Sequence, residues 1–214
     1  MVHLFKMNNE VPLNPSQNAF LKKCLPAWSH TMSLTYKRWQ DRQAYLGGRY
    51  LLLEGLKKLS LPVAMLNSLK YSEHGRPYLP LNIDFNISHS GKYILLAMSN
   101  GHRIGIDIEE IKKIEINDFK KQFSNSELLM INQAYNKYAE FFKYWTIKEA
   151  VIKADGRGMD IDLKSIVINE NAYVDGKVWY LKEIKVSEGY AVHIATDSIV
   201  ADEIICDFVN IPEN

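Results

Sequence analysis

Hydrophobic residues first recur at helical spacing between residues 38 and 59. The apolar positions that lie seven, four and three residues apart in this stretch are Tyr45, Leu52, Leu56 and Leu59. This periodicity predicts an amphipathic helix. Gly47 and Gly48 fall in its middle, where each costs about 1 kcal/mol of helix stability relative to alanine. The pair indicates either a close approach by another backbone or a ligand, or a break in the helix.

The pattern then changes to short strand-like runs separated by turns. These runs cover residues 85–88, 93–98 and 103–109. His89-Ser90-Gly91 is typical of a tight connection between strands, and Asn100-Gly101 is a hairpin sequence. Three strands joined by such short turns favour an antiparallel meander.

The second half of the chain repeats this order loosely. Ser124 and Glu127 form a capping-box sequence that predicts the start of a helix. A longer helical pattern covers residues 137–154, and Asp155-Gly156 predicts its end. Residues 163–209 predict several further strands. Helices followed by antiparallel strands, twice over, predict an α+β fold with two similar halves that pack together.

Composition narrows the class of protein. The 214 residues are 47% hydrophobic and 24% charged, which is typical of a soluble globular protein. Lys and Arg number 26 against 25 for Asp and Glu, so we expect no binding to nucleic acid or membranes through overall charge. Cys24 and Cys206 argue against a disulfide framework. Residues 1–6 lack a signal-peptide pattern. We therefore expect a cytoplasmic protein.

One predicted strand carries two carboxylates on the same face. Alternation places Ile104, Ile106 and Ile108 on the core side and Gly105, Asp107 and Glu109 on the other. Charges two residues apart, at roughly 7 Å, repel by about 2.4 kcal/mol at an effective dielectric constant near 20. In a cleft, such a pair needs a cation. Alternatively, the strand runs out into a solvated acidic turn, because Glu110 follows directly.

The later helix carries a third carboxylate on an apolar face. Glu149 lies between Trp145 and Ile152 on the stripe that begins at Phe141, and Lys153 continues the line one turn on. A carboxylate among aromatic residues needs a partner or a metal ion. A Glu149–Lys153 helix pair worth about 0.3–0.5 kcal/mol is the plainer explanation. Three such carboxylates suit Mg²⁺ together with phosphate oxygens.

Polar residues precede the acidic strand. Ser88 and His89 stand at a predicted strand end, and Arg76 in the preceding turn could meet a phosphate. The segment could equally be only a polar turn. A Ser-His-Asp hydrolase is disfavoured because neighbouring side chains diverge on a strand and no Gly-x-Ser-x-Gly motif is present.

Together these segments resemble the 4'-phosphopantetheinyl transferase family. The matching motifs are Gly75-Arg76-Pro77, Phe85-Asn86-Ile87-Ser88-His89-Ser90-Gly91, Ile104-Gly105-Ile106-Asp107-Ile108-Glu109, and Trp145-Thr146-Ile147-Lys148-Glu149 followed by Lys153. Their order and spacing are similar to those of the larger, pseudo-dimeric single-chain branch. This resemblance implies two similar subdomains, residues 1–102 and 103–214, each an antiparallel sheet packed with a long helix and related by pseudo-twofold symmetry.

The resemblance also implies roles for individual residues. Asp107, Glu109 and Glu149 would hold Mg²⁺, with Glu149 as the base and Asp107 and Lys153 as further catalytic groups. The groups implied to bind coenzyme A are Arg76, Ser88, His89 and Lys153. Lys148 points away from the line of Glu149, which leaves its role open. An arginine that relatives carry in the early helix is replaced here by Gln43 or Ala44, and either Arg42 or Arg49 could substitute for it.

The implied reaction moves phosphopantetheine from coenzyme A to a serine of an acyl or peptidyl carrier protein. The implied protein is a monomer. There are two alternatives. One is a Mg²⁺-dependent pyrophosphohydrolase that acts on coenzyme A or a nucleotide. The other is a non-enzymatic protein that binds coenzyme A or a carrier protein. Phe119, Lys120, Lys121 and Phe123 could form a docking surface for an acidic carrier protein, or an ordinary amphipathic helix.

Overall fold

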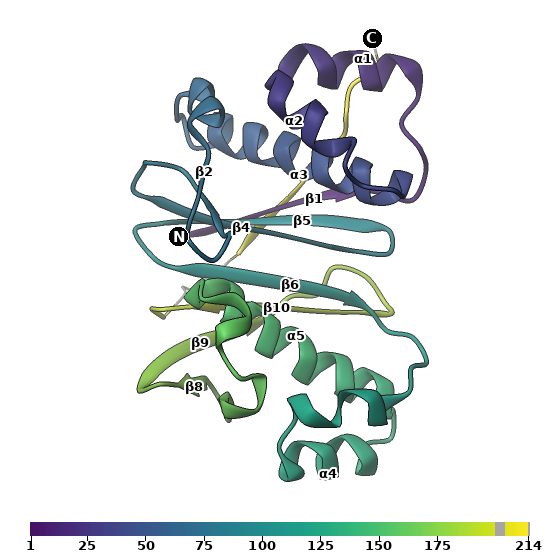
Figure 1. Cartoon of the computed structure of the whole chain (residues 1–214), viewed down its shortest axis with the longest axis vertical. Coiled ribbons are helices and arrows are strands. Elements are labelled where there is room, and N and C mark those ends of the chain that lie inside the picture. Colours follow the sequence, from purple (N-terminus) through teal and green to yellow (C-terminus); the bar gives the residue numbers. More distant parts are fainter. Residues whose placement is uncertain (200–203, 214) are drawn as a thin grey trace.

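The chain folds into two helix-covered sheets, as a computed structural model that describes residues 1–199 and 204–213 shows (Figure 1). The helices are α1 (Pro15–Cys24), α2 (Ala27–Ser33), α3 (Trp39–Lys58), α4 (Asn125–Gln133) and α5 (Lys137–Asp155), with short 3-10 helices η1 (Val63–Ser68), η2 (Ile116–Gln122), η3 (Gly158–Asp160) and η4 (Leu163–Ser165). The strands are β1 (Val2–Asn8), β2 (Lys70–Tyr71), β3 (Pro77–Tyr78), β4 (Ile83–Ser90), β5 (Tyr93–Asn100), β6 (Ile104–Glu110), β7 (Val167–Ile168), β8 (Ala172–Val174), β9 (Lys177–Glu183), β10 (Tyr190–Thr196) and β11 (Ile205–Phe208).

The two main sheets lie between the two long helices. One has the strand order β11-β1-β5-β4, and the other has the order β6-β10-β9-β8-β7. Figure 1 shows α3 on the outer side of the first sheet and α5 on the outer side of the second. Leu4, Ala97, Ile106 and Ile194 belong to a buried cluster shared by the two sheets. The predicted α+β class is therefore confirmed, and antiparallel pairing dominates both sheets.

Helix α3 forms where the hydrophobic periodicity predicts it, and it is unbroken at the glycine pair. A Cβ atom at Gly47 would collide with the side chains of Met7 and Ile94. A Cβ at Gly48 would lie 3.0 Å from the Cγ2 atom of Ile87. The glycines thus let α3 sit directly on sheet side chains, which is neither of the two expected explanations.

The predicted three-strand meander is wrong at its third strand. β4 and β5 do form an antiparallel hairpin, but β6 pairs with β10 in the second sheet. On the edge of β6 that faces β4, backbone N–H groups donate hydrogen bonds to side chains of β4, and no backbone ladder joins the two strands. This substitution separates the two sheets, because side chains hold strands farther apart than direct backbone pairing does.

We call this contact between β4 and β6 the seam. Four side chains on one face of β4 each accept a hydrogen bond from a backbone N–H of β6. The pairs, acceptor first, are Asp84 with Ile104, Asn86 with Ile106, Ser88 with Ile108, and Ser90 with Glu110, at 2.9, 2.9, 3.4 and 3.1 Å. Buried N–H groups need partners. The polar alternation of β4 supplies them.

The other face of β6 lies against α5. As predicted, the isoleucines of this strand are buried in the cluster between the sheets, and Gly105, Asp107 and Glu109 face the opposite way. A Cβ atom at Gly105 would overlap the backbone of Ala150 and Ala154. Glycine at this position therefore sets how closely the helix carrying Glu149 approaches the strand carrying Asp107.

Substitution of Gly105 by alanine should destabilise the protein strongly. The new methyl group meets helix backbone, which cannot rotate aside, and overpacking of this kind costs about 3 kcal/mol. Gly48→Ala is the matched control, because its methyl would meet only side-chain atoms of Ile87, none closer than 3.0 Å, and it gains helix propensity of about 1 kcal/mol. Urea unfolding measures both. Equal stability of the two variants would contradict the close packing of α5 on β6.

Buried His193 should make the stability of the fold depend on pH. Its side chain on β10 is 4% exposed, and its Nδ1 lies 2.7 Å from the Thr146 hydroxyl of α5. Burial, with a smaller contribution from Lys143, lowers the pKa of His193 to about 4. The unfolded chain, with the ordinary pKa of 6.5, then binds the proton more readily than the folded protein.

The free energy of unfolding should therefore fall as the pH drops from 6.5 toward 4, by up to about 1.4 kcal/mol per unit from this one group. His193→Gln removes that contribution. Urea unfolding at pH 7 and pH 5 should show a smaller loss of stability in the variant than in the wild type. An identical loss in both would show that His193 is not the group that titrates.

The C-terminal strand returns to the first sheet. β11 pairs in parallel with β1, from His3 opposite Ile205 to Lys6 opposite Phe208. The chain after β6 therefore contributes to both sheets, and the division at residues 102 and 103 and the pseudo-twofold symmetry stay predictions. Cys24 and Cys206 are both free.

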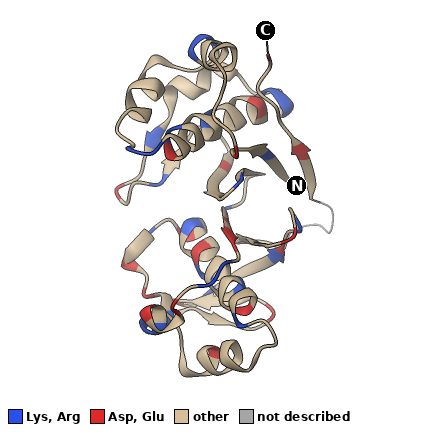
Figure 2. Cartoon of the chain, turned by 90° about the vertical axis from the view of Figure 1, so that its right-hand side faces the viewer, with Lys and Arg blue, Asp and Glu red and all other residues tan. Residues whose placement is uncertain are grey.

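Charge and hydropathy add two general findings. Acidic and basic positions are mixed over both halves of the molecule in Figure 2. None of the helices in the described part of the chain combines the length and the apolar character needed to cross a bilayer.

Candidate functional site

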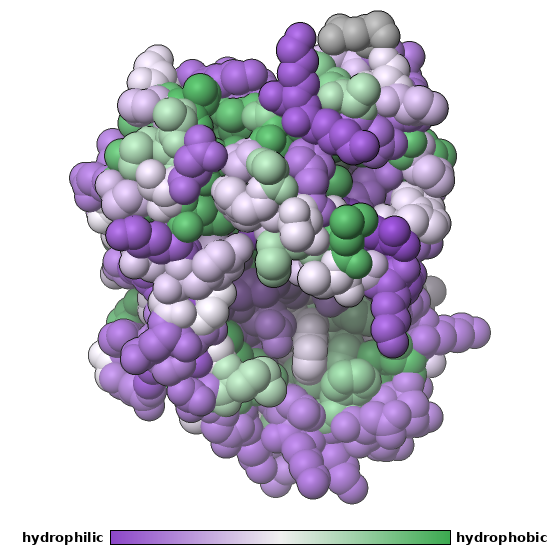
Figure 3. Space-filling view, turned by 45° about the horizontal axis from the view of Figure 1, so that its top comes forward, coloured by the Kyte–Doolittle hydropathy of each residue, from purple (hydrophilic) through white to green (hydrophobic). Residues whose placement is uncertain are grey.

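A cleft of about 360 Å³ opens where β4, β6 and α5 meet. The residues that line it are Ile87, Ser88, His89, Asp107, Glu109, Trp145, Glu149 and Lys153. Figure 3 shows the surface hollowed between the upper and lower parts of the molecule, with both hydrophilic and hydrophobic residues inside the hollow. The three predicted carboxylates, the predicted lysine and the Ser88-His89 pair therefore share one cavity, although they come from three elements.

Asp107 is the most buried of the cleft carboxylates, at 3% exposed. Its Oδ1 accepts a hydrogen bond from the Ser88 hydroxyl at 2.9 Å. The same oxygen forms an ion pair with Lys153 Nζ at 2.5 Å. Lys153 Nζ also donates to Ser88 Oγ at 3.1 Å. Asp107 Oδ2 is buried and has no hydrogen-bond partner among the described residues. A buried carboxylate oxygen without a partner is costly, so this atom is one that a ligand could satisfy.

Glu109 and Glu149 are half-buried in the same cleft. Burial raises the pKa of Glu149, the negative charge of Asp107 raises it further, and Lys153 opposes both. Burial also raises the pKa of Glu109, whereas its hydrogen bond from Ser90 lowers it. Both shifts mean that negative charge in this cleft is unfavourable as it stands. A cation bound here would stabilise the charged forms of both carboxylates.

The donor set suits a hard divalent cation, although the side chains do not form a preassembled metal cage. In residues 1–199 and 204–213, no three His, Cys, Asp or Glu side chains are close enough together to hold a metal ion. The ammonium group of Lys153 lies against the Asp107 oxygen. The unpaired Oδ2 of Asp107 and the oxygen-only chemistry of three carboxylates fit Mg²⁺, which prefers such ligands.

Arg76 lies outside the cleft. Its guanidinium forms a bidentate ion pair with Asp84, at 2.7 and 2.8 Å, and donates to the carbonyls of Lys153 and Ile104 at 2.8 and 2.7 Å. It thereby ties the last turn of α5 to β4 and β6 with a nearly fully buried side chain. The guanidinium of Arg76 does not enter the cleft that Ser88, His89 and Lys153 line, and its contact with coenzyme A stays a prediction.

Lys148, whose role the sequence left open, is fully buried and points away from the cleft. It donates to the carbonyls of Leu163 and Ile166 and forms an ion pair with Glu127 at 2.9 Å. Glu127 also closes the predicted capping box from the third residue of α4, and the structure confirms that box. Lys148 therefore fastens α4 and the segment after α5 to α5 itself.

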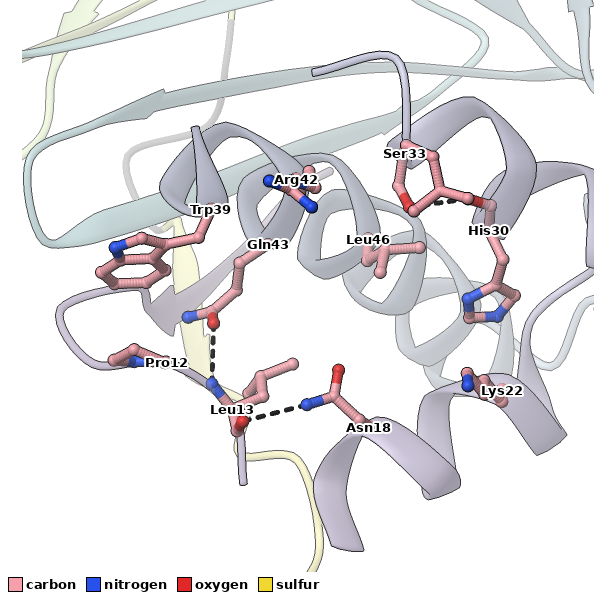
Figure 4. A pocket seen from close by; sticks show the side chains of 11 residues that line it. Pro12, Leu13, Asn18, Lys22, His30, Ser33, Trp39, Arg42, Gln43 and Leu46 are labelled. Carbon is pink, nitrogen blue, oxygen red and sulfur yellow. Dashed lines mark hydrogen bonds between the residues drawn. The ribbon is translucent and has the colours of Figure 1, made fainter. Parts of the chain in front are cut away.

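In the early helix, α3, the residues near the position of the missing arginine have other contacts. Gln43 is buried, accepts from Leu13 N and donates to Val11 O, both at 2.9 Å, so it holds the segment before α1 (Figure 4). Arg42 lines a separate pocket of about 430 Å³ between α1, α2 and α3. Arg49 is buried on Tyr45, with its guanidinium carbon 4.5 Å from the ring centroid. Neither arginine lines the cleft.

Of the residues that could form a docking surface after β6, only the lysines are exposed. Phe123 is fully buried and Phe119 packs edge-on against Phe141 and Trp145, whereas Lys120 and Lys121 are exposed. This arrangement is that of an ordinary amphipathic helix, formed by η2 and by Phe123, which follows it directly. The aromatic residues serve the core beneath α5.

Two features of the site were missed by sequence reasoning. Ser90 donates to Glu109 Oε2 at 2.8 Å, and Asp84 and Asn86 complete the seam that holds β4 against β6. The signal was present, because small polar residues occupy alternate positions of β4. Period two predicts a shared face, but it does not name the strand that this face contacts.

Comparison with known proteins covers almost the whole chain. Residues 103–204 match the 4'-phosphopantetheinyl transferase superfamily, and residues 13–101 match the N-terminal region of 4'-phosphopantetheinyl transferase. Among individual relatives, the chain is 42% identical over 102 residues to 4'-phosphopantetheinyl transferase gsp of Aneurinibacillus migulanus, covering 47% of this chain and 43% of that protein.

Two further relatives extend the match. Identity to 4'-phosphopantetheinyl transferase Sfp of Bacillus subtilis is 32% over 136 residues, covering 57% of this chain and 59% of that protein. Identity to L-aminoadipate-semialdehyde dehydrogenase-phosphopantetheinyl transferase of Rattus norvegicus is 27% over 191 residues, covering 73% and 62%. The chain thus spans about half the length of the relatives that it matches. The two family matches, which together cover residues 13–101 and 103–204, show that the chain belongs to the 4'-phosphopantetheinyl transferase family.

Proposed function

We propose that this protein transfers 4'-phosphopantetheine from coenzyme A to a serine of an acyl or peptidyl carrier protein. The serine oxygen attacks the phosphorus that bears pantetheine, and the bond from that phosphorus to the bridging oxygen of the diphosphate breaks. Adenosine 3',5'-bisphosphate leaves with that oxygen. The serine proton passes to Glu149.

One observation carries the proposal. Asp107, Glu109, Glu149 and Lys153 line a single cleft in a chain that belongs to the family. A cleft lined by three carboxylates and one ammonium group suits a reaction in which charge on a diphosphate must be held and redistributed. The raised pKa of Glu149, which follows from burial and from Asp107, suits a proton acceptor.

The cleft residues divide the work by chemistry. Lys153 supplies a fixed positive charge for the diphosphate, and Ser88 and His89 would contact coenzyme A phosphates. Asp107, Glu109 and Glu149 would hold Mg²⁺. Mg²⁺, when bound, neutralises charge on the diphosphate and on its departing oxygen. Trp145 lines one side of the cleft.

The remaining proposals concern the surroundings of the enzyme. Its partners are the carrier protein and coenzyme A, and nucleic acid and membranes are not among them. We further propose that the protein acts as a monomer in the cytoplasm. We also propose that the chain forms two subdomains, residues 1–102 and 103–214, related by pseudo-twofold symmetry.

The test is mass spectrometry of an apo carrier protein after incubation with this protein, coenzyme A and MgCl₂. We expect the carrier mass to increase by one phosphopantetheine, and we expect a chelator to prevent this gain. A carrier protein whose acceptor serine is replaced by alanine is the matched control. Formation of free pantetheine phosphate with no change in carrier mass would instead identify a hydrolase.

A further inference from the structure

Two serines of β4 contact β6 in the same way. The Ser88 hydroxyl accepts a hydrogen bond from Ile108 N and donates one to Asp107. The Ser90 hydroxyl accepts from Glu110 N at 3.1 Å and donates to Glu109 at 2.8 Å. Each serine therefore joins the backbone of β6 to the carboxylate of the preceding residue on that strand.

This double contact fixes the carboxylate relative to its own strand. A hydroxyl has one hydrogen to donate, and accepting a backbone N–H directs that hydrogen away from the backbone. In both cases it points to the carboxylate. Asp107 has a second anchor in Lys153, whereas the hydrogen bond that holds Glu109 comes from Ser90. Glu109 should thus be the carboxylate that depends more on its serine.

We propose that Ser90 is a positioning residue that orients Glu109 for binding a divalent cation. The inference rests on the proposed function, because it assigns Glu109 to that cation. Ser90 does not line the cleft itself, so it acts through the carboxylate and not on a substrate. Asn86 makes the same kind of seam contact, from Oδ1 to Ile106 N at 2.9 Å, without touching a carboxylate.

The experiment compares Ser90→Ala, Ser90→Thr and Asn86→Ala with the wild type. Binding of Mn²⁺ alone is measured from the electron paramagnetic resonance signal of free Mn²⁺, and thermal melting reports the stability of each variant. Loss of a hydrogen bond to a metal-ligating carboxylate weakens metal affinity by about 10- to 100-fold. We expect at least about a tenfold rise in the Kd of Ser90→Ala, and restoration to within about threefold of the wild-type Kd by Ser90→Thr.

Asn86→Ala separates positioning from stability. It should lower the melting temperature, because it leaves a buried N–H without its acceptor, but the Mn²⁺ Kd should stay near that of the wild type. If the wild type binds Mn²⁺ and Ser90→Ala binds it equally well, the role of Ser90 is overturned while the proposed function stands. If the wild type itself binds no Mn²⁺, the proposed metal site fails, and the role of Ser90 fails with it.

Discussion

Asp107→Ala should lower phosphopantetheine transfer by at least about 1,000-fold, which corresponds to about 4 kcal/mol of transition-state stabilisation. Asp107 is the most buried carboxylate of the cleft, and its Oδ2 has no protein partner among the described residues. Its removal takes away both a proposed cation ligand and the anion that holds Lys153 in the cleft. The rate of carrier modification measures the loss.

The fold of Asp107→Ala should persist. Lys153 has 27% of its side chain exposed and can turn to water when its partner is removed, and the loss of Asp107 also relieves repulsion on Glu149. Circular dichroism and thermal melting check this. Glu110→Ala is the matched control, because Glu110 is on the same strand but does not line the cleft, and its rate should stay within about threefold of the wild type. Normal turnover by Asp107→Ala would remove this residue from the mechanism.

Lys153→Met should separate turnover from metal affinity. The ammonium group lies 2.5 Å from Asp107 Oδ1 and 3.1 Å from Ser88 Oγ, so it competes with a cation for the same carboxylate. Its loss removes a positive charge from the site of phosphoryl transfer, and removal of one such stabilising group costs about 100- to 1,000-fold in rate. Methionine roughly keeps the length of the side chain and leaves Asp107 without its ion pair, while the hydrogen bond from Ser88 remains.

We therefore expect slower transfer together with tighter binding of Mn²⁺ to the protein alone. Steady-state rates give the first quantity and the resonance signal of free Mn²⁺ gives the second. A parallel fall in rate and in Mn²⁺ affinity would mean that Lys153 merely supports Asp107. Unchanged transfer would exclude Lys153 from the reaction.

Local patterns predict the parts of the fold that depend on neighbours in the sequence. The spacing of Leu52 and Leu56 predicts α3, Gly156 ends α5 with a φ of 89°, and alternation along β6 gives the correct two faces. The face that carries Asp107 is where the sequence predicts it. These features follow from periods of 3.6 and 2 and from the backbone freedom of glycine, all of which are visible within a few residues.

Long-range pairing is what the sequence does not reveal. β6 joins β10, so that Asp107 is opposite His193, and nothing near residue 107 specifies a partner in that distant segment. The seam between β4 and β6 could not be predicted for the same reason. The hydrogen bond between Asn86 and Ile106 depends on how the fold places the two strands. Arg76 shows the limit most clearly. A positive charge at this position is compatible with binding a phosphate. It is equally compatible with the internal hydrogen bonds that Arg76 makes, and the sequence does not distinguish the two.

The most direct test is a pulsed electron paramagnetic resonance measurement on the protein with Mn²⁺ and coenzyme A. The method detects hyperfine coupling from phosphorus atoms bonded through one oxygen to the metal ion. If three carboxylates from β6 and α5 hold a cation against the diphosphate, one bound Mn²⁺ should show phosphorus coupling, and Asp107→Ala should lose it. Mn²⁺ bound to the wild type without phosphorus coupling, or coupling that persists in Asp107→Ala, would contradict this assignment of the cleft.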